Sequence, residues 1–130
     1  MKVVFDANIF ISAIVIPGAR SERALLRISE GRDILIISKP VIDEILSILS
    51  MKVGRDKEEI SRVAVYLTDL ATLVYPTRKV RILRAGPDNR IIECAVSGRA
   101  DAVVTGDKEM LALKEYLGTK IISLREYLET

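Results

Sequence analysis

Short apolar runs alternate with amphipathic segments along the whole chain. The runs cover residues 2–6, Asp33–Ile37, Ala71–Tyr75, Ala102–Thr105 and Lys120–Ile122. Runs of this length that are rich in Val and Ile are typical of buried strands. Strands that alternate with helices form parallel sheets with right-handed crossovers. We therefore expect a three-layer α/β/α fold, and 130 residues suit a single domain that spans the chain, 1–130.

The segments between these runs carry apolar residues at helical spacing. The predicted helices are Asn8–Val15, Ser21–Glu30, Pro40–Met51, Lys57–Leu70, Asp88–Ser97, Lys108–Leu113 and Ser123–Leu128. The third and fourth follow one another without an intervening strand, which predicts a helical hairpin. Its apolar residues exceed what packing on a sheet requires. Met51 and Val53 near its tip are therefore candidate contacts in a homodimer or higher homo-oligomer.

The residue types that are missing narrow the possible chemistry. The chain has no histidine and one cysteine, Cys94. This excludes Ser-His-Asp and Cys-His catalysis, histidine zinc sites and an intramolecular disulfide. Oxygen ligands remain, and they select magnesium, manganese or calcium. No apolar run approaches the roughly 18 residues of a membrane span, and Asp6 interrupts any signal-peptide core, so we expect a cytoplasmic protein.

Four carboxylates fall at strand ends and helix starts. Asp6 and Asp107 follow two of the apolar runs, and Glu44 and Asp88 lie in the first turns of two helical segments. In a parallel sheet these positions share one edge, where open α/β folds bind ligands. Two charges about 4 Å apart repel by about 4 kcal/mol at an effective dielectric near 20. Four acids at one edge therefore indicate a site for divalent cations.

Each of these acids also has a structural explanation. Asp6 and Asp88 are suited to cap helix N-termini, where the helix dipole favours an anion. Glu44 could be a solvated helix residue, but it borders the apolar face of its helix, whereas Asp43 lies near the centre of the polar side. Asp88 shares its angular position with the apolar residues that would pack on the sheet. The sequence leaves both explanations open.

Two polar residues are expected to support the acids. Asn8 lies two residues after Asp6 and is placed to orient it or to hold a metal-bound water, and Thr105 is placed to hydrogen-bond the neighbouring acids. Asp101 precedes a strand and is expected at the opposite edge of the sheet. Glu93 and Glu109 are interpreted as exposed helix residues.

Positive charge is concentrated in one loop, 77–87, although the net charge is only +2. Its basic residues are Arg78, Lys79, Arg81 and Arg84. Such cations are either solvated or contact a phosphate backbone, which requires only distributed positive charge. The chain has no RNP-like aromatic motif and too few aromatic residues for a stacking platform.

The chain resembles the PIN-domain family of metal-dependent ribonucleases over almost its whole length, from residue 2 to about 124. The matching stretches are VVFDANIFISAI, KPVIDEILSIL, PDNRIIECA and ADAVVTGDKEML. It is especially similar to VapC-type toxins of toxin–antitoxin pairs. The resemblance implies a five-stranded parallel sheet in the order 3-2-1-4-5. It also implies one or two Mg²⁺ or Mn²⁺ ions, cleavage of RNA to leave a 5′-phosphate, and an antitoxin as a possible protein partner.

By matching position, the resemblance gives roles to six residues. The catalytic and metal-binding acids would be Asp6, Glu44, Asp88 and Asp107, with Thr105 as their hydroxyl neighbour and Asn8 as the polar companion of the first acid. The bound cation would activate water for in-line attack on the scissile phosphate.

Three alternatives belong to other classes. A phosphatase of the haloacid-dehalogenase type needs Asp-x-Asp after its first strand, whereas Asp6-Ala7-Asn8 lacks the second acid. A receiver domain needs a phosphoacceptor after its third strand, where Tyr75-Pro76 stands. A PIN fold that binds RNA or protein without cutting is the stronger alternative, although the intact set of four acids argues against it.

Overall fold

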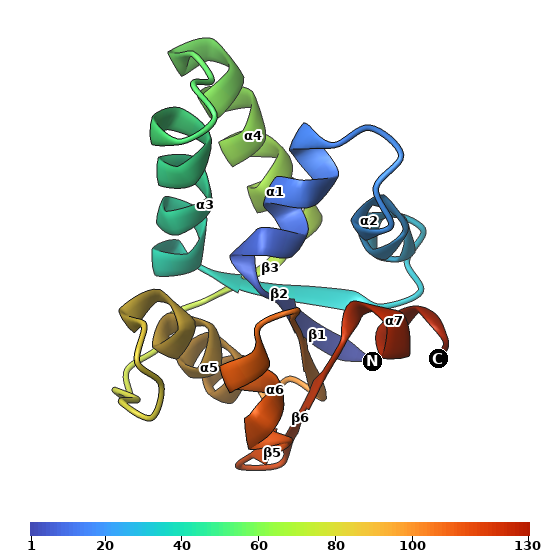
Figure 1. The fold of residues 1–130 in the computed structure, drawn as a ribbon, viewed down its shortest axis with the longest axis vertical. Helices are drawn as coiled ribbons and strands as arrows, with labels where there is room; N and C mark the ends of the chain where they lie inside the picture. The colour runs from blue at the N-terminus through green and yellow to red at the C-terminus, as the bar shows by residue number, and fades with distance from the viewer.

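The computed structural model describes all 130 residues as a sheet with helices on both faces (Figure 1). The strands are β1 (Lys2–Phe5), β2 (Ile34–Ser38), β3 (Thr72–Val74), β4 (Ala102–Val104), β5 (Glu115–Tyr116) and β6 (Thr119–Ile122). The helices are α1 (Ala7–Val15), α2 (Ser21–Ser29), α3 (Lys39–Met51), α4 (Lys57–Leu70), α5 (Gly86–Gly98), α6 (Lys108–Leu113) and α7 (Leu124–Leu128). The predicted three-layer α/β fold is confirmed.

The sheet has the strand order β3-β2-β1-β4-β6-β5. The first five strands in this order are parallel, as expected, but the predicted total of five strands is wrong. The additional strand, β5, pairs antiparallel with β6. The turn between them places Leu117 and Gly118 at φ 47° and φ 87°. Positive φ at both central residues is the geometry of a tight hairpin turn, and a two-residue strand is too short to show a periodic pattern.

The central strand β1 is deeply buried from Val3 to Phe5. Val3, Val4 and Phe5 are buried, because β1 lies between β2 and β4 and is covered on both faces. Helices α1 to α4 lie on one side of the sheet, and α5 and α6 lie on the other (Figure 1). The ring of Phe5 packs against Phe10 of α1 and Tyr127 of α7, with centroid distances of 5.8 and 5.5 Å.

A buried polar cluster holds α7 and α2 against this core. The Tyr127 hydroxyl donates to Asp33 Oδ2 at 2.7 Å, and Arg27 Nη1 donates to the Tyr127 carbonyl at 2.7 Å. Burial alone would raise the pKa of the Asp33 carboxyl. Hydrogen bonds from the Met1 amine and Tyr127, and the charges of that amine and Arg27, outweigh burial and hold the pKa below its ordinary value.

Two other predictions on the helices can be compared with the structure. The helical hairpin is present: α3 and α4 pack on each other and rise from the sheet (Figure 1). Helix α5 begins at Gly86, two residues earlier than expected, with Pro87 in its first turn.

Cys94 lies buried within α5, as a core residue. None of the helices is both long and apolar enough to span a membrane.

The close contact between α5 and β2 gives a prediction about stability. A Cβ atom on Gly98 would overlap Cγ2 of Ile36, whereas one on Gly86 would meet nothing within 4 Å. We expect Gly98→Ala to lower the free energy of unfolding by about 1–3 kcal/mol, because Ile36 is buried and cannot yield freely. Urea denaturation measures this.

Gly86→Ala, in the same helix, is the matched control and should change stability by less than about 1 kcal/mol. Alanine is favoured over glycine within helices, so an unstrained Gly98→Ala would leave the protein equally or more stable. That outcome would contradict the packing of α5 on β2 described above.

Candidate active site

The parallel register of β1 and β4 brings Asp6 and Thr105 together. Phe5 is level with Val104, and the Asp6 amide donates to the Val104 carbonyl at 2.9 Å. The next residues, Asp6 and Thr105, therefore leave neighbouring strands at the same level. The Thr105 hydroxyl donates to Asp6 Oδ2 at 2.7 Å, and both side chains are buried. Asp6 also caps α1 by accepting from the Asn8 amide at 3.5 Å, so its structural role and its place in the acidic set coexist.

The same hydroxyl also positions Asp107. The Asp107 amide donates to Thr105 Oγ1 at 3.0 Å, and Asp107 Oδ2 accepts from the Met110 amide at 2.9 Å as the N-cap of α6. Thr105 Oγ1 therefore donates to one acid and accepts from the backbone of another. This single buried hydroxyl fixes the relative positions of the first and last acids of the set.

The other two acids face Asp6 from different helices. Glu44 of α3, Asp88 of α5, Asp6 and Asn8 line one small hollow of about 70 Å³ at the carboxyl edge of the sheet. Its apolar walls come from Ala7, Val41, Ile48 and Ile91, with one proline from the first turn of α3 and one from the first turn of α5. Asp107 does not line this hollow. It is linked to Asp6 by the Thr105 hydroxyl, which accepts from the Asp107 amide and donates to the Asp6 carboxylate.

Asp88 is not a helix cap, so that explanation for it is wrong. The N-cap of α5 is Ala85, and Asp88 is the third residue of the helix, with no hydrogen bond or ion pair to its carboxylate. Burial raises the pKa of the Asp88 carboxyl to about 6, with further contributions from the negative charges of Asp6, Asp107, Glu109 and Glu44. The negative charges of all the other acids at this edge therefore act on the Asp88 carboxylate.

Burial also raises the pKa of Asp6. The hydrogen bonds from Thr105 and from the Asn8 amide oppose this effect, and the charge of Asp107 adds to it. None of the four acids forms an ion pair with a basic side chain: the salt bridges of the protein all lie elsewhere. The edge thus holds uncompensated negative charge at neutral pH.

The four carboxylates fit a divalent cation in ligand type and in charge. Hard cations such as Mg²⁺ and Mn²⁺ bind carboxylate oxygens, and a cation would remove the repulsion that raises the pKa of Asp88. No three of these side chains converge closely enough in the structure to hold one ion. The acids therefore form an open group of donors rather than a preformed coordination shell.

The loop 75–85, here called the basic loop, joins β3 to α5 without regular secondary structure. Two side chains of α5 hold its backbone. Asn89 Oδ1 accepts from the amides of Ile82 and Leu83 at 3.1 and 2.9 Å, and Glu93 Oε2 accepts from the Val80 amide at 2.8 Å. The loop is therefore fixed in one conformation by hydrogen bonds from a neighbouring helix.

Glu93 was expected at the surface, and that prediction is wrong. It is 5% exposed and pairs with Arg90 Nε at 2.9 Å. Neither Asn89 nor Glu93 was predicted to matter near the site. Their spacing in the sequence could have indicated a shared role, because polar residues at i and i+4 lie on one face of a helix and that face must contact something polar. Their partner, the loop backbone, cannot be read from the sequence.

Two apolar side chains of the basic loop point into the protein and its basic side chains are exposed to solvent. Val80 and Leu83 are buried, whereas all four predicted basic residues, Arg78, Lys79, Arg81 and Arg84, are exposed. Only Arg84 approaches an acid, with its Nε 3.8 Å from Glu109, and its backbone amide donates to Glu109 Oε1 at 2.9 Å. Glu109 therefore joins the end of the loop to α6, next to Asp107.

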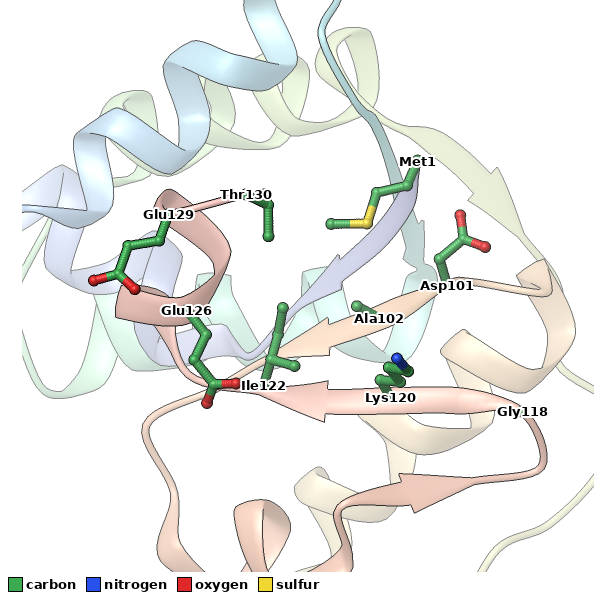
Figure 2. Close-up of a pocket in the computed structure, with 9 residues that line it drawn as sticks. All are labelled: Met1, Asp101, Ala102, Gly118, Lys120, Ile122, Glu126, Glu129 and Thr130. Carbon is green, nitrogen blue, oxygen red and sulfur yellow. The ribbon is translucent and has the colours of Figure 1, made fainter.

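A larger hollow of about 810 Å³ lies along β4 and β6 beside α7 (Figure 2). It is broad, and the charged ends of Asp101, Lys120, Glu126 and Glu129 are spread around it rather than directed at one point (Figure 2). The Asp101 carboxylate accepts from the Lys2 amide at 2.7 Å, which places it at the amino edge, as expected. This hollow has no convergent set of chemical groups.

The match to known families agrees with this arrangement. Residues 2–109 match the PIN domain family, so the chain belongs to the PIN domain family. The protein is also 27% identical over 119 residues to the uncharacterized protein MJ1680 of Methanocaldococcus jannaschii, a match that covers 88% of this chain and 76% of that protein.

Two solved structures share the fold. A chain of VapBC2 from Rickettsia felis, bound to a DNA fragment from its promoter, superimposes with a TM-score of 0.69 at 19% identity, covering 95% of this chain and 98% of that one. A chain of VapBC-1 from nontypeable Haemophilus influenzae gives a TM-score of 0.64 at 18% identity, covering 96% and 99%. At this identity the likeness establishes the fold.

The mutual repulsion of the acids gives a prediction that does not require a metal. In EDTA, the pKa of Asp88 should be about 6, and Asp107→Asn should lower it, because one neighbouring negative charge is removed. Carboxyl-carbon NMR titration measures this. Asp101→Asn, at the other edge of the sheet, should leave it unchanged. An Asp88 pKa that stays the same in Asp107→Asn would show that these two acids do not interact.

Proposed function

We propose that this protein is a Mg²⁺- or Mn²⁺-dependent endoribonuclease that hydrolyses RNA phosphodiester bonds at the carboxyl edge of its sheet. One observation carries the proposal. Carboxylates from four separate elements meet at this edge without a basic partner, and their charges raise the pKa of Asp88 beyond the effect of burial. The repulsion costs free energy in the absence of a ligand. A divalent cation bound at this edge would remove that cost and would attract a phosphate.

Asp6, Glu44, Asp88 and Asp107 would hold one or two ions. A bound divalent cation supplies Lewis acidity, which activates water and offsets negative charge on the scissile phosphate. The chain's own residues position these parts. Thr105 holds Asp6 in place by the 2.7 Å hydrogen bond, and Asn8 lines the hollow beside Asp6 and offers an exposed polar group to a water molecule or the substrate.

The basic loop would hold the substrate next to these acids. Its free cations offer phosphate contacts that carry no sequence information, and hydrogen bonds from α5 hold the loop backbone that carries them. Preorganisation of this kind lowers the ordering cost of binding. The acids at the sheet edge would thus cleave the RNA, and the cations of the loop would bind the RNA backbone.

The same proposal includes protein partners. The two solved structures are of VapBC proteins, which supports a toxin role with an antitoxin partner for this chain. A cytoplasmic location and a homodimer or higher homo-oligomer belong to the proposal as predictions. Met51, at the end of α3, is 82% exposed and remains the candidate subunit contact together with the half-buried Val53.

The first test is cleavage of end-labelled single-stranded RNA with Mn²⁺ or Mg²⁺. Glu44→Gln keeps the size of the side chain but removes a charged oxygen ligand, so we expect at least about a hundredfold loss of rate. Asp43→Asn is the matched control. Asp43 directly precedes Glu44 in α3 and forms an exposed ion pair with Lys39, so the loss of its charge should leave the rate nearly unchanged.

Cleavage that survives EDTA, or that Glu44→Gln leaves intact, would contradict the metal-dependent mechanism. Metal binding without cleavage of a varied RNA pool would favour the alternative of a PIN fold that binds RNA or protein without cutting.

The second test separates binding from cleavage by means of salt. Arg78→Gln with Lys79→Gln should weaken RNA binding about equally for all sequences and reduce the slope of log K against log salt by about 1.4, or about 0.7 per lost contact with a single strand. Arg62→Gln with Lys57→Gln on α4 removes the same charge at a distance. An equal effect of both pairs would show that net charge, rather than the basic loop, governs binding.

A further inference from the structure

Tyr75 stands at the level of the acids, two strands away from Asp6. Lys2 and Val3 pair with Ile34 and Leu35, which places Asp6 level with Ser38. Ser38 in turn pairs with Val74. Tyr75, one residue further, therefore leaves β3 at the same carboxyl edge of the sheet. Two strand spacings of about 4.8 Å separate the chain there from Asp6 by about 10 Å. A few nucleotides of extended RNA cover this separation.

The ring of Tyr75 is exposed and has no partner in the protein. Tyr75 is 75% exposed, and neither aromatic ring pair of the structure involves it. The only cation over a ring is Arg27 over Tyr127. No hydrogen bond to or from the Tyr75 hydroxyl is formed. The other tyrosines differ: Tyr127 is buried, Tyr116 is partly buried, and Tyr66 is 41% exposed on α4.

The backbone at Tyr75 is restrained on both sides. A residue before proline is confined to extended backbone, and Pro76 follows directly. On its other side, Tyr75 continues from β3, which is paired with β2. The backbone that carries the ring is therefore already ordered, and stacking on a flat ligand has to order only the side chain.

Charge at this position indicates the kind of ligand. The basic loop starts at Tyr75, and its first two cations, Arg78 and Lys79, form no ion pair. An aromatic ring followed by free cations is suited to single-stranded nucleic acid, because the ring stacks on a base while the cations contact the phosphates. A protein partner would need an apolar surface around the ring, but the neighbouring Thr77 and Arg78 are exposed polar residues.

We infer that Tyr75 is a base-stacking residue that binds one nucleotide of the RNA substrate beside the acidic edge. This inference rests on the proposed ribonuclease function and adds a contact to a base, whereas the basic side chains of the loop contact only the backbone. The ring sets the position at which the strand enters the site and thereby which phosphate lies at the acids. A single ring of this kind is not the extended stacking platform that the sequence excludes.

The test measures binding without cleavage. Labelled oligouridine is titrated in EDTA into protein that carries Asp6→Asn, and the dissociation constant is followed by fluorescence anisotropy. Tyr75→Ala should raise the dissociation constant at least about fivefold, since stacking on one base contributes about 1 kcal/mol or more. Tyr75→Phe should bind as tightly as the parent, because the ring remains and the hydroxyl makes no hydrogen bond. Tyr66→Ala is the matched control and should have no effect.

Two readouts separate stacking from a merely structural role. The chain has no tryptophan, so its emission comes from four tyrosines. Oligouridine should quench this emission in the parent, and Tyr75→Phe should remove most of the quenching while it preserves affinity. An oligonucleotide that lacks the bases should bind the parent and Tyr75→Ala equally.

Equal binding of oligouridine by Tyr75→Ala and the parent would overturn the inference and leave the ribonuclease proposal intact. No binding by any form, the parent included, would also overturn the inference, and the cleavage test with Mn²⁺ or Mg²⁺ would then decide the ribonuclease proposal separately. A change of mass in light scattering caused by Tyr75→Ala, without a change in affinity, would instead assign the ring to a contact with a second copy of the chain.

Discussion

The position of β1 in the centre of a parallel sheet is the constraint on which the site depends. Because β1 pairs with β2 and β4 in fixed register, Asp6, Ser38 and Thr105 leave their strands at one level. The hydrogen bond from Thr105 to Asp6 then fixes the first acid, and the Asp107 amide binds the same hydroxyl. A slip of one residue in either pairing would turn Asp6 or Thr105 to the other face and dismantle this arrangement.

The site combines charge that the fold does not neutralise with a scaffold that the fold holds firmly. Asp6 and Asp107 are the N-caps of α1 and α6, and Asp88 lies in the first turn of α5, so their backbones are fixed by secondary structure even though their side chains repel one another. Asn89 and Glu93 apply the same principle to the basic loop, whose backbone they bind from α5. The elements that carry the acids pack on the core, and this packing offsets the free-energy cost of the repulsion at the edge.

Much of this arrangement could be predicted from the sequence, because strand ends and helix starts are local signals. The parallel α/β class, the helical hairpin and the clustering of Asp6, Glu44 and Asp88 follow from hydrophobic periodicity and the geometry of parallel sheets. The strand β5 escaped prediction, since two residues show no period. Glu93 escaped because its partner is the backbone of a loop, which leaves no pattern in the residues. Helical-wheel position gave the correct direction for Asp88 but could not show that Ala85 caps the helix.

The central claim is that the four carboxylates act together as one site for divalent cations. Anomalous diffraction from a crystal soaked in Mn²⁺ tests this most directly, because it locates the ion without relying on activity. The account predicts a peak among Asp6, Glu44, Asp88 and Asp107, with at least two of their carboxylates in contact and no peak in a crystal of Asp6→Asn. Saturating Mn²⁺ with no peak at this edge, or with peaks only in the hollow around Asp101, would contradict the account.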